Sequence, residues 1–203
     1  MPYFSVKNRD YFFLHLPKTG GRTIEKIFQP YLPHDARGIG QGHEYLRGKP
    51  ESFSFCILRN PLDRLVSVFH YLKKGGIWQG DLDDAKKYDI LDNSFPDWVN
   101  LLYNNPTKYF RQQHIEPISN RIPVFEWIDE YFLFDVFDSQ VKGLFENVTG
   151  DTLEEVPKVN QSKHDGFMTY YDDDLKNKVT ELYGDDFTMY EKVKTSYEAL
   201  HSE

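Results

Sequence analysis

The chain of 203 residues is 39% hydrophobic and 16% aromatic, which supplies enough apolar material for one domain with a full core over residues 1–203. Its formal net charge of −8 argues against a broad basic face for nucleic acid, and its single cysteine, Cys56, excludes an intrachain disulfide and a cysteine-based zinc site. No apolar run approaches the roughly 18 to 20 residues of a membrane span, and the N-terminus lacks a signal-peptide pattern, so we expect a soluble, cytoplasmic protein without a transmembrane segment.

The first predicted unit is a strand, a turn and a helix. Residues 11–16 (YFFLHL) form a short apolar run that ends at a turn rich in proline and glycine, which is typical of a buried strand. After the turn, Ile24, Ile27 and Phe28 recur at helical spacing. This order places backbone N–H groups and a helix N-terminus where they can bind an anion.

A second unit repeats the pattern. Residues 52–58 (SFSFCIL) predict another buried strand. Asn60 and Pro61 then provide an N-cap and a proline at the first helical position, and apolar residues over 62–72 predict the helix that follows.

The rest of the chain predicts further alternation of strands and helices. Residues 73–95, with paired glycines and an acidic run, are expected to form a surface excursion that is either a solvated loop or a lid. The other predicted elements are a helix over 96–103, a strand over 131–137, a helix over 139–145 and a last helix over 172–183. We therefore expect an α/β fold, a three-layer αβα arrangement around a central, mainly parallel sheet.

The first turn has an unusual order of residues. A nucleotide-triphosphate P-loop places its lysine after the glycines, whereas here the lysine comes before them. The paired glycines still allow a tight turn around an anion, and two threonines add hydroxyl donors. The candidate anion-binding residues are Pro17, Lys18, Thr19, Gly20, Gly21, Arg22 and Thr23.

The second unit carries an arginine at the end of its strand and a serine eight residues later on the next helix, Arg59 and Ser67. The guanidinium offers a fork of donors to a phosphate, and the hydroxyl can complete the site.

These two motifs, in this order, resemble the donor-binding motifs of sulfotransferases that use 3′-phosphoadenosine 5′-phosphosulfate (PAPS), nearest to the carbohydrate branch of the heparan sulfate 2-O/6-O type. The resemblance implies a P-loop-like fold, a 5′-phosphosulfate loop at 17–23, and a 3′-phosphate site at Arg59 and Ser67. A weaker match at 159–163 implies that Asn160, Ser162 and Lys163 also contact the donor. The product is PAP, and the chemistry requires no metal.

Transfer of a sulfuryl group needs a base for the acceptor hydroxyl and a cation for the leaving oxygen. Lys18 is the predicted cation. His43 lies in a glycine-rich segment between the two motifs, where the resemblance implies the catalytic histidine, and Glu44 is the alternative base. Arg111 and His114 are candidate contacts for the acceptor, and His15 is predicted to be buried and structural.

The resemblance implies a hydroxyl acceptor, which we expect to be a carbohydrate, a glycolipid or another small alcohol. The polymer substrate of heparan-modifying relatives is not carried over, because their basic cleft is not visible in this acidic sequence. Two other functions stay open: a PAP- or nucleotide-binding module without turnover, and an ATP-dependent kinase. The displaced lysine and the lack of a clear magnesium-binding pair disfavour the kinase.

Overall fold

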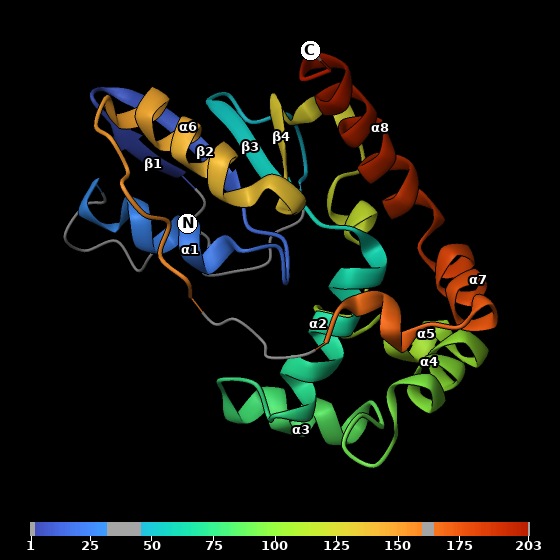
Figure 1. Ribbon diagram of the computed structural model, residues 1–203. Coiled ribbons are helices and arrows are strands. Elements are labelled where there is room, and N and C mark those ends of the chain that lie inside the picture. The colour runs from blue at the N-terminus through green and yellow to red at the C-terminus, as the bar shows by residue number, and fades with distance from the viewer. Residues whose placement is uncertain (1–2, 32–45, 160–164, 203) are drawn as a thin grey trace. The chain divides into compact units, whose positions relative to one another are not determined.

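The computed structural model describes residues 3–31, 46–159 and 165–202 (Figure 1). They belong to two compact units. Unit 1 comprises Met1–Arg59, Ile118–Gln161 and Met189–Glu203, and unit 2 comprises Asn60–Pro117 and Ser162–Thr188. The single domain over 1–203 stays a prediction.

Unit 1 is built on a sheet to which the described residues contribute four strands, in the spatial order β1 (Tyr3–Val6), β2 (Arg9–Leu14), β3 (Phe53–Leu58) and β4 (Glu130–Leu133). β1 is antiparallel to β2, whereas β2, β3 and β4 run parallel. The expectation of a mainly parallel sheet is therefore confirmed.

The antiparallel strand β1 was not predicted from the sequence. It joins β2 through a two-residue turn in which Lys7 and Asn8 both have positive φ, at 51° and 61°. Two such residues match the twist of a hairpin, which explains the tight connection although the turn has no glycine.

The faces of the sheet follow the alternation of side chains along each strand. Phe13, Phe55 and Phe132 pack on one face with apolar residues of α1 (Gly21–Phe28) and α6 (Phe137–Thr149). Leu14 and Leu58 pack on the other face, against apolar residues of the segment 118–128 and of the end of α8 (Gly184–Leu200). Helices thus cover the sheet on both faces within unit 1, and α6 lies across the strands in Figure 1.

The third predicted strand is shorter than expected. β4 ends at Leu133, the chain continues as a 3₁₀ turn over Phe134–Val136, and α6 begins at Phe137. The aromatic run 131–137 therefore leaves the sheet after Leu133. Its residues Phe134 and Phe137 pack next to Gly20.

Unit 2 is helical, and its core surrounds the fully buried Trp98. Its elements among the described residues are α2 (Pro61–Lys73), α3 (Gln79–Lys87), α4 (Phe95–Asn104), α5 (Pro106–Tyr109), the 3₁₀ turn Phe167–Tyr170, α7 (Asp173–Leu182) and the first residues of α8. The predicted helices 62–72, 96–103 and 172–183 correspond to α2, α4 and α7.

Two predictions in this part of the chain were wrong. Residues 73–95 are no surface excursion, because they contain α3 and bury Ala85, Tyr88 and Ile90 in the core of unit 2. Helix α7 does not close the chain either, since α8 follows it directly.

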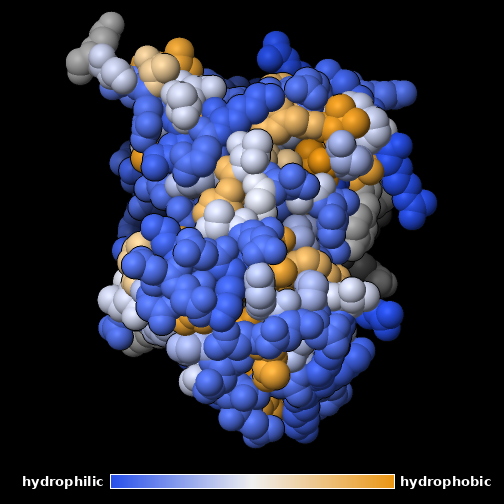
Figure 2. Space-filling model, turned by 90° about the vertical axis from the view of Figure 1, so that its right-hand side faces the viewer, coloured by the Kyte–Doolittle hydropathy of each residue, from blue (hydrophilic) through white to orange (hydrophobic). Residues whose placement is uncertain are grey.

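Exposed apolar side chains are scattered over the surface. Figure 2 shows one face, on which hydrophobic residues form small patches among hydrophilic ones. None of the helices in the described segments has the length and apolar character that a membrane crossing requires.

Candidate functional site

The predicted anion-binding turn connects β2 to α1 at the carboxyl edge of the sheet. Lys18 and Gly20 both adopt positive φ, at 65° and 89°, and α1 begins at Gly21. The carbonyl of Gly20 accepts the first helical hydrogen bond, from the Thr23 N–H at 2.9 Å. The N–H groups of the first turn that precede Thr23 thus lie at the start of a helix, as an anion site requires.

The two glycines are required by close packing as well as by backbone conformation. A Cβ on Gly20 would lie 2.7 Å from the ring of Phe137, and a Cβ on Gly21 would lie 2.1 Å from Cδ2 of His15. Both distances are too short for any side chain. The paired glycines therefore let the turn lie directly on an aromatic ring and an imidazole.

A buried polar network that includes His15 packs against the turn at Gly21. Nδ1 of His15 lies 3.0 Å from one carboxylate oxygen of Glu25, and the other oxygen accepts a hydrogen bond from Arg22 at 3.1 Å. His15 and Glu25 are buried, whereas the Arg22 side chain is half exposed. The prediction that His15 is buried is confirmed, and Glu25 is a supporting residue that sequence reasoning missed.

The two threonines use their hydroxyls within the protein in this structure. Thr19 is fully buried and donates to the carbonyl of Leu16 at 3.0 Å. Thr23 donates to the carbonyl of Pro157 at 3.4 Å. Both hydroxyls fix the path of the chain around the turn, and their predicted contact with an anion stays a prediction.

Arg59 joins the second motif to the first. Its Nη1 donates to the carbonyl of Lys18 at 3.0 Å, and its guanidinium lies over the ring of Phe134, 4.3 Å from the centroid. Because β2 and β3 are parallel neighbours, the residues that follow them meet at the same edge of the sheet. The arginine of the second motif thus contacts the backbone of the first motif at Lys18, within unit 1.

Ser67, Arg111 and His114 belong to unit 2. Ser67 lies on α2 and is buried, His114 is also buried, and Arg111 is exposed. The participation of Ser67 in the phosphate site, and of the other two residues in acceptor binding, stays a prediction.

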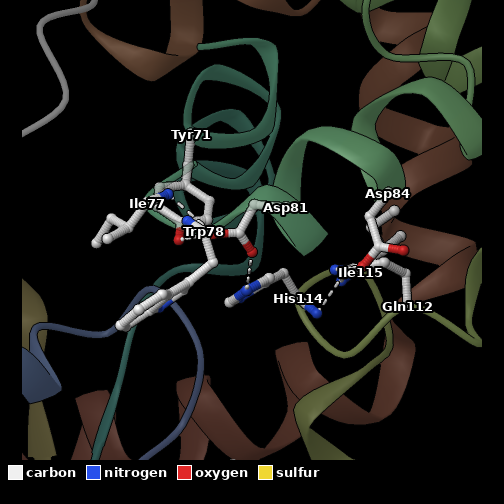
Figure 3. A network of polar contacts seen from close by, with 8 residues as sticks. All are labelled: Tyr71, Ile77, Trp78, Asp81, Asp84, Gln112, His114 and Ile115. Carbon is white, nitrogen blue, oxygen red and sulfur yellow. Dashed lines mark hydrogen bonds and ion pairs between the residues drawn. The ribbon is translucent and has the colours of Figure 1, made fainter. Parts of the chain in front are cut away.

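His114 belongs to a polar network centred on the buried Asp81 (Figure 3). The Asp81 carboxylate accepts hydrogen bonds from the Tyr71 hydroxyl at 2.6 Å and from the N–H groups of Ile77 and Trp78 at 2.9 and 3.0 Å. Nε2 of His114 lies 3.8 Å from the same carboxylate.

Burial alone raises the pKa of Asp81, but His114, Tyr71 and the two backbone N–H groups outweigh it and hold the pKa below its ordinary value. The sequence pattern placed Asp81 in an acidic surface run. The two glycines that precede it, at 75 and 76, were the only local signal of a turn held by that carboxylate.

The remaining predicted site residues, His43, Glu44, Asn160, Ser162 and Lys163, lie outside the described residues. Their roles stay predictions. Within 3–31, 46–159 and 165–202, no group of three or more histidine, cysteine or acidic side chains is arranged to hold a metal ion.

Comparison with known proteins identifies a family. A model of the sulfotransferase family matches residues 40–193, which is most of the chain and includes Arg59 and Ser67. The match begins after the turn at 17–23, so the role of that turn rests on its own residues and geometry. Neither a curated protein nor a solved structure matches this chain.

Proposed function

This chain belongs to the sulfotransferase family, and from that membership we propose that it transfers a sulfuryl group from PAPS to an acceptor hydroxyl and releases PAP. The observation that carries the proposal is the hydrogen bond from Arg59 to the carbonyl of Lys18. It links a glycine turn that suits a 5′-phosphosulfate to an arginine that suits a second phosphate. A donor with a phosphate at each end of its nucleoside fits such a pair of cationic groups.

The donor would be held mainly through unit 1. The N–H groups at the start of α1 and the Lys18 ammonium would bind the 5′-phosphosulfate, and Arg59 the 3′-phosphate. Ser67 and the residues of the late loop, Asn160, Ser162 and Lys163, would add further contacts.

In the transfer step, the acceptor oxygen forms a bond to sulfur while the bond between sulfur and the bridging oxygen of the 5′-phosphate breaks. The acceptor proton passes to His43, or to Glu44 as the alternative base, and the bond electrons remain on the phosphate of PAP. Lys18 stabilises the charge that develops on that leaving oxygen. Most of the rate enhancement then comes from positioning and electrostatics, as in phosphoryl transfer.

Measurement of ³⁵S transfer from labelled PAPS to a panel of sugars, glycolipids and phenols tests this proposal. Lys18→Met should lower kcat by at least about a hundredfold, since removal of one group that stabilises transition-state charge has an effect of that size. Lys26→Met is the matched control, because Lys26 is an exposed lysine in the last turn of α1, the helix that follows Lys18. His43→Ala should lower kcat similarly if His43 is the base.

Thermal unfolding with added PAP, ATP or ADP separates this function from its alternatives, because a ligand that binds only the folded state raises its unfolding temperature. PAP is expected to stabilise the protein and ATP is not. Stabilisation by ATP without an effect of PAP would contradict the proposal, and stabilisation by PAP without transfer to any acceptor would favour a binding module.

A further inference from the structure

Unit 1 contains a cavity at the amino edge of its sheet. The residues that line it start the three parallel strands, at 9–11 in β2, 51–53 in β3 and 130–132 in β4, and continue on α6 and the end of α8. Its volume is about 1560 Å³, larger than the roughly 300–1,000 Å³ of an ordinary small-molecule site. The turn at 17–23 follows the opposite end of β2, so this cavity is a separate place in the same unit.

The walls of the cavity are mainly apolar. Leu144 and Val148 contribute from α6, and Val193 from α8. Two further large apolar side chains in the wall stay open to solvent, Phe53 at 39% and Leu200 at 80% exposure. The aromatic residues that line the cavity are Tyr11, Phe53, Tyr131, Phe132 and Tyr197. A concave site with such walls favours a ligand that has an extended apolar body.

Negative charge predominates in the same walls. Asp10, Glu51 and Glu130 line the cavity, and Arg9 is the arginine that opposes them. Asp10 accepts a hydrogen bond from the Ser5 hydroxyl, whereas the Glu130 carboxylate has neither a hydrogen bond nor an ion pair within the part of the chain that the structure describes. Partial burial raises the pKa of Glu130, so the ionised carboxylate is short of compensating charge. A cation in the cavity would supply it.

We propose that this cavity binds an organic ammonium ion with an apolar chain, whose cationic end lies beside Glu130 and whose chain packs on the apolar walls. Aromatic rings attract ammonium groups over their faces, which adds to the attraction of the carboxylate. A fatty acid would instead bring a further carboxylate to an acidic site, and an inorganic cation would leave the apolar walls uncovered. The inference does not rest on the proposed function, because neither the turn at 17–23 nor Arg59 lines the cavity.

Calorimetric titration of the full chain tests the two features that the ligand needs. The probe is octyltrimethylammonium, which should bind in a ratio of one to one. Octanoate has the opposite charge, N-octylacetamide has no charge, and tetramethylammonium has no chain, so each should bind at least about tenfold more weakly. Phosphatidylcholine vesicles carry the same cation, but their chains are held in the bilayer, and they should not bind.

Glu130→Gln should weaken binding of octyltrimethylammonium about fivefold, the upper range for loss of one partly exposed charge pair. Glu146→Gln is the matched control. Glu146 is an exposed acid of α6 that does not line the cavity, so its change removes the same charge and should leave the affinity unaltered.

A substitution that fills the cavity gives the second test. Gly143 lies in the cavity wall on α6 and has nothing within 4 Å of an added Cβ, so Gly143→Tyr can place a ring there without displacing a neighbour. It should abolish binding. Gly80→Tyr is the control, at an exposed helical glycine of unit 2 with the same free space, and it should bind normally. Circular dichroism and urea unfolding verify that both variants fold.

The inference is overturned if octyltrimethylammonium does not bind, if octanoate or N-octylacetamide binds as tightly, or if the vesicles bind. It is equally overturned if folded Gly143→Tyr or Glu130→Gln keeps the full affinity. Loss of PAP binding or of sulfate transfer would contradict the proposed function and leave these results unchanged.

Discussion

The turn that precedes α1 can form only because Gly20 and Gly21 have no Cβ atom. Gly21 lies so close to His15 that even a methyl group would overlap the imidazole, and the imidazole is itself held by the Glu25 carboxylate. The imidazole of His15 therefore occupies the space that a side chain at position 21 would need. The N–H groups of the first helical turn keep their direction only while Gly21 and His15 are both in place.

Gly21→Ala should lower the free energy of unfolding by about 2 kcal/mol or more, since the added methyl overpacks a buried site, and should abolish PAP binding. Gly143→Ala is the matched control. Gly143 lies in the middle of α6, is exposed to solvent, and has nothing within 4 Å of an added Cβ. Alanine at this position should therefore raise the free energy of unfolding by about 0.5–1 kcal/mol. Urea unfolding and calorimetric titration with PAP measure both effects. An unchanged PAP affinity in Gly21→Ala would show that the turn does not bind the donor.

At the level of elements, one carboxylate connects three segments. Asp81 on α3 accepts hydrogen bonds from Tyr71 of α2 and from the N–H of Ile77 in the turn between the two helices. Its carboxylate also lies 3.8 Å from Nε2 of His114, in the segment after α5. Its folded pKa is lower than its unfolded pKa, so it contributes stability above the unfolded value, about 4, and this contribution is lost as the pH falls through the folded value.

Asp81→Asn should therefore lower the free energy of unfolding by about 2 kcal/mol at pH 7, because an amide cannot accept from three donors as a carboxylate does. The difference from the unsubstituted protein should shrink progressively below about pH 4. Asp83→Asn, on the exposed side of the same helix, should change stability by less than about 0.5 kcal/mol at either pH. Urea unfolding at several pH values tests this, and a difference that does not depend on pH would exclude an ionic role of Asp81.

The elements that could be predicted from the sequence are those with local signals. Asn60 accepts from the Leu62 N–H at 3.0 Å and caps α2 as its position before Pro61 suggested, and the apolar runs of β2 and β3 were visible in the sequence. Helix α3 was missed because the partners that bury Asp81 include Tyr71 and His114, ten and 33 residues away in the chain.

The same limit applies to the candidate site. Lys18 and Arg59 were found from the order of residues around two turns, but their hydrogen bond depends on the parallel pairing of β2 and β3. Glu25 gave no signal, since a glutamate in the middle of a short helix usually faces solvent. Its role became visible only when His15 and Arg22 were seen on either side of it.

For the whole molecule, the path of the chain links the two units. It passes from one unit to the other after Arg59, Pro117, Gln161 and Thr188. α8 runs from Gly184 to Leu200 and so belongs to both: Asp186 pairs with Arg64 in unit 2, and Tyr190 packs in the core of unit 1. If either unit unfolds, one part of α8 loses its packing contacts. The other segments that continue from one unit into the other are then no longer held at one of their ends.

We therefore expect the two units to unfold together, as a single domain. Arg64 is buried and donates to the carbonyls of His114 and Glu116 at 2.9 Å each, besides its pair with Asp186 at 3.5 Å. Arg64→Ala removes the cation that pairs with the buried Asp186 carboxylate and should cost about 3–5 kcal/mol. In 5-fluorotryptophan-labelled protein, Trp98 reports on unit 2 and Trp127 on unit 1. Both resonances should be lost at the same urea concentration, and Arg64→Ala should lower that concentration equally for both. If the Trp127 transition stays in place while that of Trp98 moves, the two units are separate domains.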